Sequence, residues 1–410
     1  MTNRSYPKAT ITQKAERALR GGHPWVYGEE ILSLSEQPEN GALVDVFSQK
    51  DRYLGTGFYN SHSKITVRLL SRNANDRFDE AFFERRLQYA IAYRKTVMPG
   101  DDFRCCRLIF GEADGMPGLT VDRFEDVLVI QTLSLGMEVR KQMIFALLLQ
   151  ILRKDFQVGI RVIYERNDSP LREREGLTQG CGYVAMEGLV TQDTGKVQIT
   201  ENGILYDVDF REGQKTGFFL DQKYNRAAVA RLAKGKQVLD CFTHTGAFAL
   251  NAARGGAAHV TAVDISADAV AMAAHNAKQN ALDHNMSFLC TDVFDLLTAL
   301  AKKNDAPYDL IILDPPAFTK SSATVANATR GYKEINYRAM KLLPRGGYLA
   351  TCSCSHFMTD ALFCHMLHDA AADAQVSLRQ IEARQQSPDH PILWNVPETD
   401  YLKFYLFQVV

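Results

Sequence analysis

The sequence predicts an α/β protein with several domains, in which a doubly wound parallel sheet follows a β-rich start and an α+β middle region. The chain has 410 residues, enough for two or three domains. Its composition, 46% hydrophobic and 23% charged, is that of a globular protein. From about residue 191 onward, short apolar strands alternate with helical segments, the pattern of a parallel sheet covered by helices.

The first region, residues 1–73, consists of short β segments separated by Gly, Asn and Ser. We expect strands at 42–47, 53–59 and 65–70. This spacing predicts a small β-rich domain, either a barrel or a sandwich.

The middle region, residues 74–190, mixes helix and strand. An apolar stripe with helical periodicity predicts a helix at 78–97. The other elements that we expect are a helix at 139–153 and strands at 107–110, 119–123, 127–132 and 161–164. These elements predict an α+β layer that contains a two-stranded hairpin.

The third region, residues 191–410, repeats a strand–helix unit. We expect strands at 237–240, 260–264, 287–291, 310–313 and 348–352, and helices at 246–254, 267–280, 293–302 and 328–343. In such a sheet, ligands bind at the carboxyl ends of the strands.

Charge and cysteine usage exclude several classes of protein. The net charge is −1, so the chain is not a bulk polycation, although residues 1–28 carry five basic residues against one acid, a local excess of +4. These basic residues either contact phosphate groups or form a face exposed to solvent. No signal peptide or membrane span is visible, and the eight cysteines form no CxxC pair, which predicts a cytoplasmic protein without a metal site.

Three acids lie at the ends of the first three strands of the third region or directly after them. Asp240 precedes a helix that Gly246 opens, and no GxGxxG is present, so a cationic or hydroxyl-bearing ligand suits this turn better than a pyrophosphate. Asp264 can accept two ribose hydroxyls, and Asp292 can accept an adenine amine. The alternative for each is that the carboxylate only caps a helix or turn.

The fourth and fifth strands end in residues that suit chemistry on a flat ligand. Asp314 is followed by two prolines, which fix an extended loop beyond the strand. Cys352 lies in the fifth strand and Cys354 at its exit. We expect Cys352 to be a packing residue, and Cys354 to converge with Asp314 on one crevice as a nucleophile.

These segments resemble a known family. DCFTHTG, AVDIS, DPPAF, RGYKEIN and TCSCS together resemble class I S-adenosylmethionine (SAM)-dependent methyltransferases, and more narrowly the RlmI-like 23S rRNA (cytosine-5) methyltransferases. GGHPWVYGEEI, GEADGMPGLTVDRFED, YERND and GQKTGFFLDQ resemble the same family, so the likeness covers nearly the whole chain. It implies a PUA domain at 1–73, a central domain of EEHEE type at 74–190 and a Rossmann-like methyltransferase domain at 191–410.

The resemblance also implies roles for individual residues. Cys354 corresponds to the nucleophile and Asp314 to the acid near the base. The residues implied in binding SAM are Asp240, Phe242, Thr243, Thr245, Gly246, Asp264, Ile265, Asp292, Val293, Phe219 and Asp221. The implied partner is 23S rRNA or a precursor of the large ribosomal subunit, with no membrane; a homodimer is left open.

Two points qualify this assignment. Other RNA cytosine-5 methyltransferases carry a second cysteine after the strand-four proline, whereas Pro316 and Ala317 occupy that place here, as in the RlmI-like pattern. The base that removes the proton from carbon 5 is not identified, and His356, Asp221 and a water molecule are the candidates.

Two rival functions remain: methylation of a guanine nitrogen in rRNA, which needs no thiol, and a non-catalytic RNA-binding factor in ribosome assembly.

Overall fold

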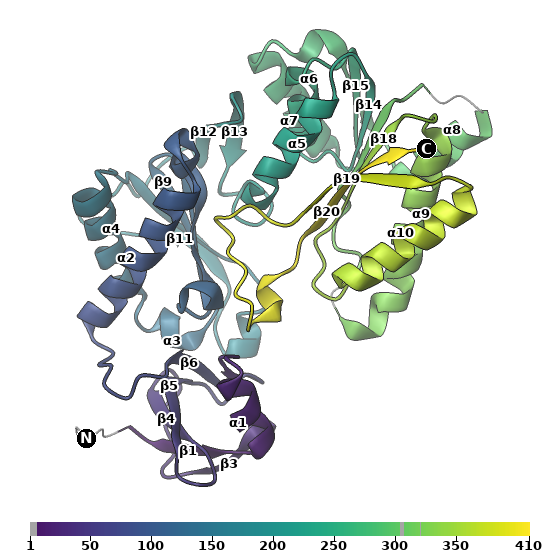
Figure 1. The fold of residues 1–410 in the computed structure, drawn as a ribbon. Coiled ribbons are helices and arrows are strands. Elements are labelled where there is room, and N and C mark those ends of the chain that lie inside the picture. Colours follow the sequence, from purple (N-terminus) through teal and green to yellow (C-terminus); the bar gives the residue numbers. More distant parts are fainter. Residues whose placement is uncertain (1–5, 304–306, 320) are drawn as a thin grey trace. The chain divides into compact units, whose positions relative to one another are not determined.

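The computed structural model describes residues 6–303, 307–319 and 321–410 (Figure 1). Its internal contacts divide the chain into two compact units. The first unit comprises Met1–Ile199, Val208–Leu220 and Pro388–Thr399, and the second comprises Thr200–Asp207, Asp221–Ser387 and Asp400–Val410. No described helix has the length and apolar character needed to cross a membrane.

The first unit begins with a six-stranded sheet and one helix. The strands are β1 (Lys8–Ile11), β2 (Trp25–Val26), β3 (Ile31–Leu34), β4 (Leu43–Phe47), β5 (Tyr53–Tyr59) and β6 (Val67–Ser71), in the order β2-β6-β5-β4-β1-β3, and the helix is α1 (Gln13–Arg20). The expected strand at 53–59 has these bounds, and the other two are displaced by one or two residues. Sequence reasoning missed β1, β2 and β3, because two to four residues are too few to show an alternating pattern.

A five-stranded sheet follows in the same unit. Its strands are β7 (Cys105–Phe110), β8 (Leu119–Phe124), β9 (Val127–Thr132), β10 (Val162–Asn167) and β11 (Gly180–Tyr183), in the order β11-β10-β9-β8-β7, and its helices are α2 (Glu80–Val97), α3 (Leu135–Glu138) and α4 (Lys141–Phe156). The expected two-stranded hairpin is therefore only part of a larger sheet. Helix α4 connects β9 to β10 as a crossover, and these two strands pair in parallel.

A buried arginine attaches a segment from the carboxyl-terminal part of the sequence to this unit. Arg94 is fully buried, and its guanidinium donates to both carboxylate oxygens of Asp114 at 2.5 and 2.8 Å. It also donates to the main-chain oxygen of Asp389 at 3.0 Å, while the Asp389 carboxylate accepts the N–H of Arg107 at 2.8 Å. These bonds explain why residues 388–399 belong to the first unit.

The second unit is a seven-stranded sheet between two layers of helices (Figure 1). Its strands are β14 (Gln237–Cys241), β15 (His259–Asp264), β16 (Met286–Cys290), β17 (Leu310–Leu313), β18 (Tyr348–Ser353), β19 (Leu378–Arg384) and β20 (Lys403–Val409). Its helices are α5 (Lys223–Leu232), α6 (Ala247–Arg254), α7 (Ala267–Gln279), α8 (Val293–Lys303), α9 (Val325–Leu342) and α10 (Asp360–Ala374). A ribbon of β12 (Lys196–Glu201) and β13 (Ile204–Asp209) contains residues of both units.

The strand order is β16-β15-β14-β17-β18-β20-β19, and the five strands from β14 to β18 are parallel, as the strand–helix alternation predicts. The expectation of a wholly parallel sheet is wrong at one edge. Strand β20 runs antiparallel to both β18 and β19. This direction pairs Lys403, the first residue of β20, with Ser353, the last residue of β18. A lysine is thereby placed at the carboxyl end of β18.

Candidate functional site

A strained loop follows β14. Phe242, His244 and Gly246 have φ angles of +64°, +50° and +84°, so every second residue of this loop is left-handed. This conformation is uncommon for residues other than glycine and costs on the order of 1–3 kcal/mol at each such residue. The loop is held by the N–H of Thr243, which donates to the Val263 oxygen of β15 at 2.9 Å. Strain of this kind, held in place by its surroundings, is typical of a ligand-binding loop.

Asp240 organises this loop from inside. The residue is fully buried, and its Oδ2 accepts the Thr243 hydroxyl at 2.5 Å and the Ala249 N–H at 2.9 Å. These are the bonds that the capping alternative expects. The other oxygen, Oδ1, is buried and has no hydrogen-bond partner among the described residues. Burial raises the pKa of Asp240 to about 7.

Gly246 is needed where α6 packs on α7. A Cβ at this position would lie 2.9 Å from the Cβ of Ala273, closer than real Cβ atoms approach, and the φ of +84° is unfavourable for other residues. The neighbouring Thr245 has a buried hydroxyl oxygen that lacks a partner within the described part of the chain. The loop therefore contains two orphaned polar atoms, at Asp240 and Thr245, that a bound ligand could satisfy.

The end of β15 presents an anchored carboxylate beside an exposed apolar side chain. Asp264 accepts the His244 N–H at 2.9 Å through Oδ2 and the Ser266 N–H at 3.0 Å through Oδ1. Each oxygen keeps a lone pair, so the carboxylate can still accept hydroxyl groups. Ile265 is 70% exposed, although it is a large aliphatic residue. A carboxylate that can accept hydroxyl groups and an exposed apolar side chain thus lie next to each other.

Asp292 and Val293 contact residues of helix α8 and of the hydrophobic core. Asp292 Oδ1 accepts the N–H groups of Phe294 at 2.7 Å and Asp295 at 3.2 Å, so it caps the start of α8. Val293 is 3% exposed and belongs to the hydrophobic core. Its side chain therefore cannot reach a ligand, and only its main chain remains available for the expected contact.

Phe219 and Asp221 fall in different units. Phe219 belongs to the first unit, where the Lys215 ammonium lies 4.7 Å from the centre of its ring. Asp221 belongs to the second unit, where it accepts the Tyr401 hydroxyl at 2.7 Å. Its charge also acts on Asp314. The expectation that both residues lie across the cofactor stays a prediction.

Asp314 lies directly after β17 and is held by a neighbouring amide. The Gln222 side chain donates to Asp314 Oδ1 at 3.0 Å. Burial, and after it the negative charge of Asp221, raise the pKa of Asp314 to about 6. A carboxyl with such a pKa can bind its proton near neutral pH when a ligand displaces water. It can then donate a hydrogen bond as well as accept one.

The two cysteines of strand β18 differ in their surroundings. Cys352 lies within the strand, is fully buried and contacts Asp314 and Gln222. Burial raises the pKa of its thiol well above the ordinary value, so Cys352 stays protonated at neutral pH. Cys354 follows the last residue of the strand and is partly exposed. Of these two cysteines, therefore, only Cys354 is accessible from outside.

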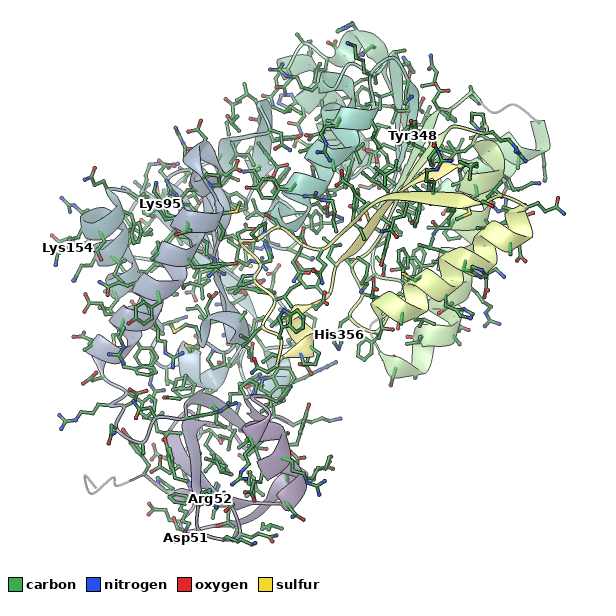
Figure 2. All side chains as sticks on the ribbon, viewed as in Figure 1. Asp51, Arg52, Lys95, Lys154, Tyr348 and His356 are labelled. Atoms are coloured by element: carbon green, nitrogen blue, oxygen red, sulfur yellow. The ribbon has the colours of Figure 1, made fainter. Side chains whose placement is uncertain are left out.

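Lys403 is the residue of this site that sequence reasoning missed. It is 4% exposed, and its ammonium donates to the Ser355 oxygen at 2.7 Å and the Tyr401 oxygen at 2.8 Å. Burial lowers its pKa to about 8, while the charges of Asp400, Cys354 and Asp360 act in the opposite direction. A signal was present in the sequence, because Lys403 is the only charged residue of the largely apolar strand KFYLFQV. His356, by contrast, is exposed beside Phe357 (Figure 2).

The basic excess at the start of the chain is partly neutralised in the structure. Three of its residues form ion pairs with carboxylates: Lys8 with Asp51, Lys14 with Glu30 and Arg20 with Glu16. Arg4 lies outside the described residues. The +4 counted along the sequence therefore does not become an unpaired patch of that charge.

Comparison with known proteins identifies the class. Residues 166–408 match the model of the family described as S-adenosylmethionine-dependent methyltransferase, and residues 9–72 match that of a PUA-like domain. A candidate SAM-dependent methyltransferase from Streptococcus mutans is 23% identical and covers 98% of this chain and 100% of its own, with a TM-score of 0.81. A methyltransferase solved in complex with SAH gives the same coverage and identity with a TM-score of 0.82. The fold is that of a SAM-dependent methyltransferase, and SAM is its cofactor.

Full-length relatives narrow the class to one family. The ribosomal RNA large subunit methyltransferase I of Klebsiella pneumoniae is 37% identical over 100% of both chains. The protein of the same name from Aeromonas salmonicida is 39% identical over 96% of this chain and 97% of its own. This chain therefore belongs to the ribosomal RNA large subunit methyltransferase I family.

Proposed function

We propose that this chain methylates carbon 5 of a cytosine in 23S rRNA through a transient covalent bond to Cys354. The observation that carries this proposal is the contrast between the two cysteines. Cys354 is accessible at the end of β18 and near a buried lysine, whereas Cys352 is fully buried. The names of the relatives support the large-subunit rRNA as substrate.

The chemistry explains why a thiol is needed. Carbon 5 of cytosine is a weak nucleophile within an aromatic ring. A bond from the Cys354 thiolate to carbon 6 breaks the 5,6 double bond and gives carbon 5 the electron density of an enamine. When bound, SAM supplies the methyl group for carbon 5. A base then removes the proton from carbon 5, the double bond returns, and the carbon–sulfur bond breaks to release the thiolate.

The neighbouring residues have roles that follow from their surroundings. The positive charge of Lys403 favours the thiolate form of Cys354. Asp314, with its pKa near 6, binds the N3 and N4 edge of the cytosine and stabilises the charge that develops there. Lys403 joins His356 and Asp221 as a candidate for the base, because a lysine with a pKa of about 8 can be neutral in part of the enzyme.

The remaining residues form the cofactor part of the proposal. Asp264 and Ile265 bind the ribose and the base of SAM, and the loop at 242–246 covers the rest of the cofactor. The domains at 1–73 and 74–190 hold the RNA, while the domain at 191–410 carries out the reaction. A homodimer stays open.

The deciding experiment compares two cysteine variants on 23S rRNA from cells that lack this protein. Cys354→Ser should lose turnover, because a hydroxyl is too weakly acidic to attack carbon 6. Cys352→Ala should keep most of its activity. Both variants should bind SAM with unchanged calorimetric affinity. RNA with 5-fluorocytosine at the target should trap an adduct, because fluorine replaces the proton that must leave.

Two outcomes would contradict the proposal. Methylation by Cys354→Ser, or an adduct mapped by mass spectrometry to Cys352, would remove the nucleophile assigned here. A methylated guanosine in the digested RNA would favour the rival acceptor, and the absence of any methylated nucleoside would favour a non-catalytic role.

A further inference from the structure

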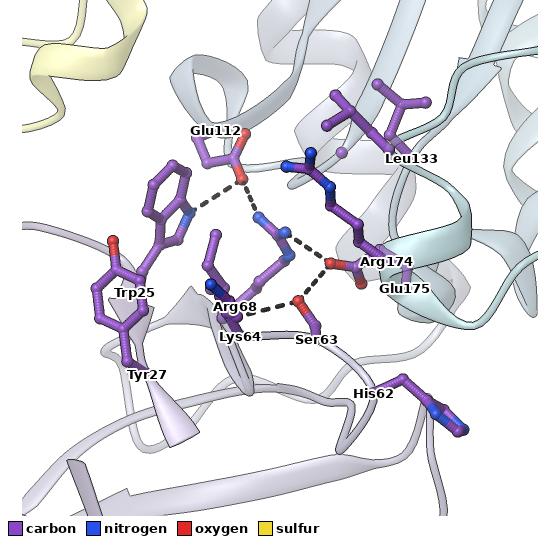
Figure 3. Close-up of a pocket in the computed structure, with 13 residues that line it drawn as sticks. Trp25, Tyr27, His62, Ser63, Lys64, Arg68, Glu112, Leu133, Arg174 and Glu175 are labelled. Atoms are coloured by element: carbon purple, nitrogen blue, oxygen red, sulfur yellow. Dashed lines mark hydrogen bonds and ion pairs between the residues drawn. The ribbon is translucent and has the colours of Figure 1, made fainter. Parts of the chain in front are cut away.

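A pocket lies in the first unit, and none of the residues that line it is assigned a role in the proposed methyl transfer. Its volume is about 840 Å³ (Figure 3). Two of the segments that carry the family resemblance, residues 21–31 and 111–126, contribute to its wall, and the proposed reaction uses neither of them. The side chains that matter here are Trp25, Tyr27, Lys64, Arg68, Glu112 and Arg174.

The floor of this pocket is fixed by a network of charged side chains. Arg68 lies between two carboxylates and donates to Glu112 at 3.0 Å and to Glu175 at 2.9 Å (Figure 3). The Trp25 indole N–H donates to Glu112 at 3.1 Å, and the Arg68 guanidinium lies 5.6 Å from the centre of the indole ring. Ser63 donates to Glu175 at 2.5 Å. The indole is thus held in one orientation before any ligand arrives, which lowers the entropy lost on binding.

The rim differs from the floor in its charge. Glu112 and Glu175 balance the charge of Arg68 in the floor, but Lys64 and Arg174 are exposed and have no ion-pair partner within residues 6–303, 307–319 and 321–410. Two unpaired positive charges therefore border a pocket whose wall contains an oriented indole and the phenol of Tyr27, which is 38% exposed. Aromatic rings inside a basic rim are the combination that binds single-stranded RNA, with bases on the rings and phosphates on the cations.

We propose that this pocket binds an unpaired nucleotide of the RNA substrate, outside the site of methylation. The base stacks on Trp25 and Tyr27, and the flanking phosphates contact Lys64 and Arg174. The volume fits within the range of small-molecule pockets, which is about 300–1,000 Å³. This inference rests on the proposed function only in taking single-stranded RNA as the substrate. An acidic peptide would also be attracted to the two cations, but it has no need of an oriented indole.

The chain allows a direct test, because it contains only two tryptophans, Trp25 and Trp394. Trp394 is 96% exposed, so Trp394→Phe should fold normally and leave Trp25 as the single tryptophan reporter. In this full-length variant, single-stranded oligo(A), oligo(C) and oligo(U) of about ten nucleotides should quench the Trp25 emission to saturation. A duplex RNA of the same length should quench it much less, because its bases are already stacked.

Variants of Lys64 and Arg174 test whether the rim cations contribute to RNA binding. Lys64→Glu combined with Arg174→Glu should weaken oligonucleotide binding at least tenfold and lower the salt dependence by about 1.4 units of slope, about 0.7 for each phosphate contact with a single strand. The matched control is Lys154→Glu on α4 (Figure 2), an exposed lysine outside the pocket that should change neither quantity. With labelled RNA, Trp25→Ala should bind about tenfold more weakly, Trp25→Phe should restore most of the affinity, and Tyr89→Ala, which removes an exposed aromatic elsewhere, should have no effect.

The possible results separate this inference from the proposed function. Absence of quenching, undiminished RNA affinity in the double charge variant, or quenching by oligo-glutamate but not by RNA would overturn the pocket assignment, even if 5-methylcytosine is formed. Saturable quenching with the expected variant effects would support the pocket even if no 5-methylcytosine is found, because this measurement does not depend on catalysis.

Discussion

The two halves of the strand-end edge in the second unit use acidic residues differently. At β14 and β15, Asp240 and Asp264 accept main-chain N–H groups and hold a strained loop. At β17 and β18, Asp314 is bound by a side-chain amide, and it lies near a pair of cysteines and a lysine whose pKa is lowered. The first half forms a rigid cradle, which we propose holds the cofactor, whereas the second contains groups that can exchange protons near neutral pH. Acidic residues at equivalent strand ends thus have different surroundings and different roles.

The largest effect that we expect in this comparison concerns the stability of the cradle. Burial raises the pKa of Asp240 from 3.8 to about 7, so the folded state holds this proton more tightly than the unfolded state. Stability from this group is fully present below about pH 4 and is lost as the pH rises towards 7. The total is on the order of 4 kcal/mol, at about 1.4 kcal/mol per pH unit.

The test of this effect is the difference between two proteins. Asp240→Asn keeps an oxygen that can accept from Thr243 and Ala249 but does not titrate. The variant should gain stability relative to the unchanged protein as the pH rises from 4 to 7, measured by calorimetric unfolding at several pH values. A difference that does not vary with pH would mean that Asp240 is ionised in the fold without penalty.

A smaller effect should appear in cofactor binding at the same half of the edge. Asp264→Ala removes the acceptor for a ribose and also the support of the His244 N–H, so SAM affinity should fall by on the order of 1–3 kcal/mol, roughly five- to 150-fold. Isothermal calorimetry measures this directly. The matched control is Asp268→Ala, an exposed acid in the first turn of α7, which should bind SAM normally. Equal affinities in the two variants would remove Asp264 from the cofactor site.

Local patterns in the sequence predicted the parallel part of the sheet well, because each strand–helix unit has its own apolar periodicity. The strand at 310–313 has the predicted bounds, and the acids lie at the carboxyl ends of their strands or just after them. The direction of β20 was not predictable in this way, since strand direction depends on connections and pairing with distant residues. Lys403 was missed for the same reason: its role arises only when β20 pairs with β18.

In the first unit, the position of unpaired charge was likewise not predictable from local sequence. A count along residues 1–28 suggested a basic surface, yet two of its five cations, Lys8 and Lys14, pair with acids outside the counted segment, Asp51 and Glu30. The unpaired cations of the pocket, Lys64 and Arg174, are separated by about 110 positions along the chain, so no sequence window contains both. A count of charges along the sequence therefore does not show where unpaired charges gather on the surface of the folded protein.

The last prediction concerns the ends of β17 and β18, and its expected effect is the smallest. Lys403→Met removes a positive charge near Cys354, so the thiolate form of Cys354 should be less favoured and its alkylation at neutral pH should slow by on the order of tenfold. Alkylation of Cys354 by iodoacetamide, followed by mass spectrometry over a range of pH, measures this without RNA or SAM. Buried Cys352 is an internal control, because it should stay unmodified in both proteins.

The sign of the pH dependence distinguishes an electrostatic role of Lys403 from a structural one. With a pKa of about 8, Lys403 is charged at neutral pH and loses its charge above pH 8. The difference between the unchanged protein and Lys403→Met should therefore be largest below pH 8 and should shrink above it. Lys403→Arg should restore the neutral-pH rate, and Lys341→Met, at an exposed lysine on α9, should change nothing. If Lys403→Met alters alkylation by the same factor at every pH, the lysine acts only through packing, and the thiolate of Cys354 must be stabilised by another group.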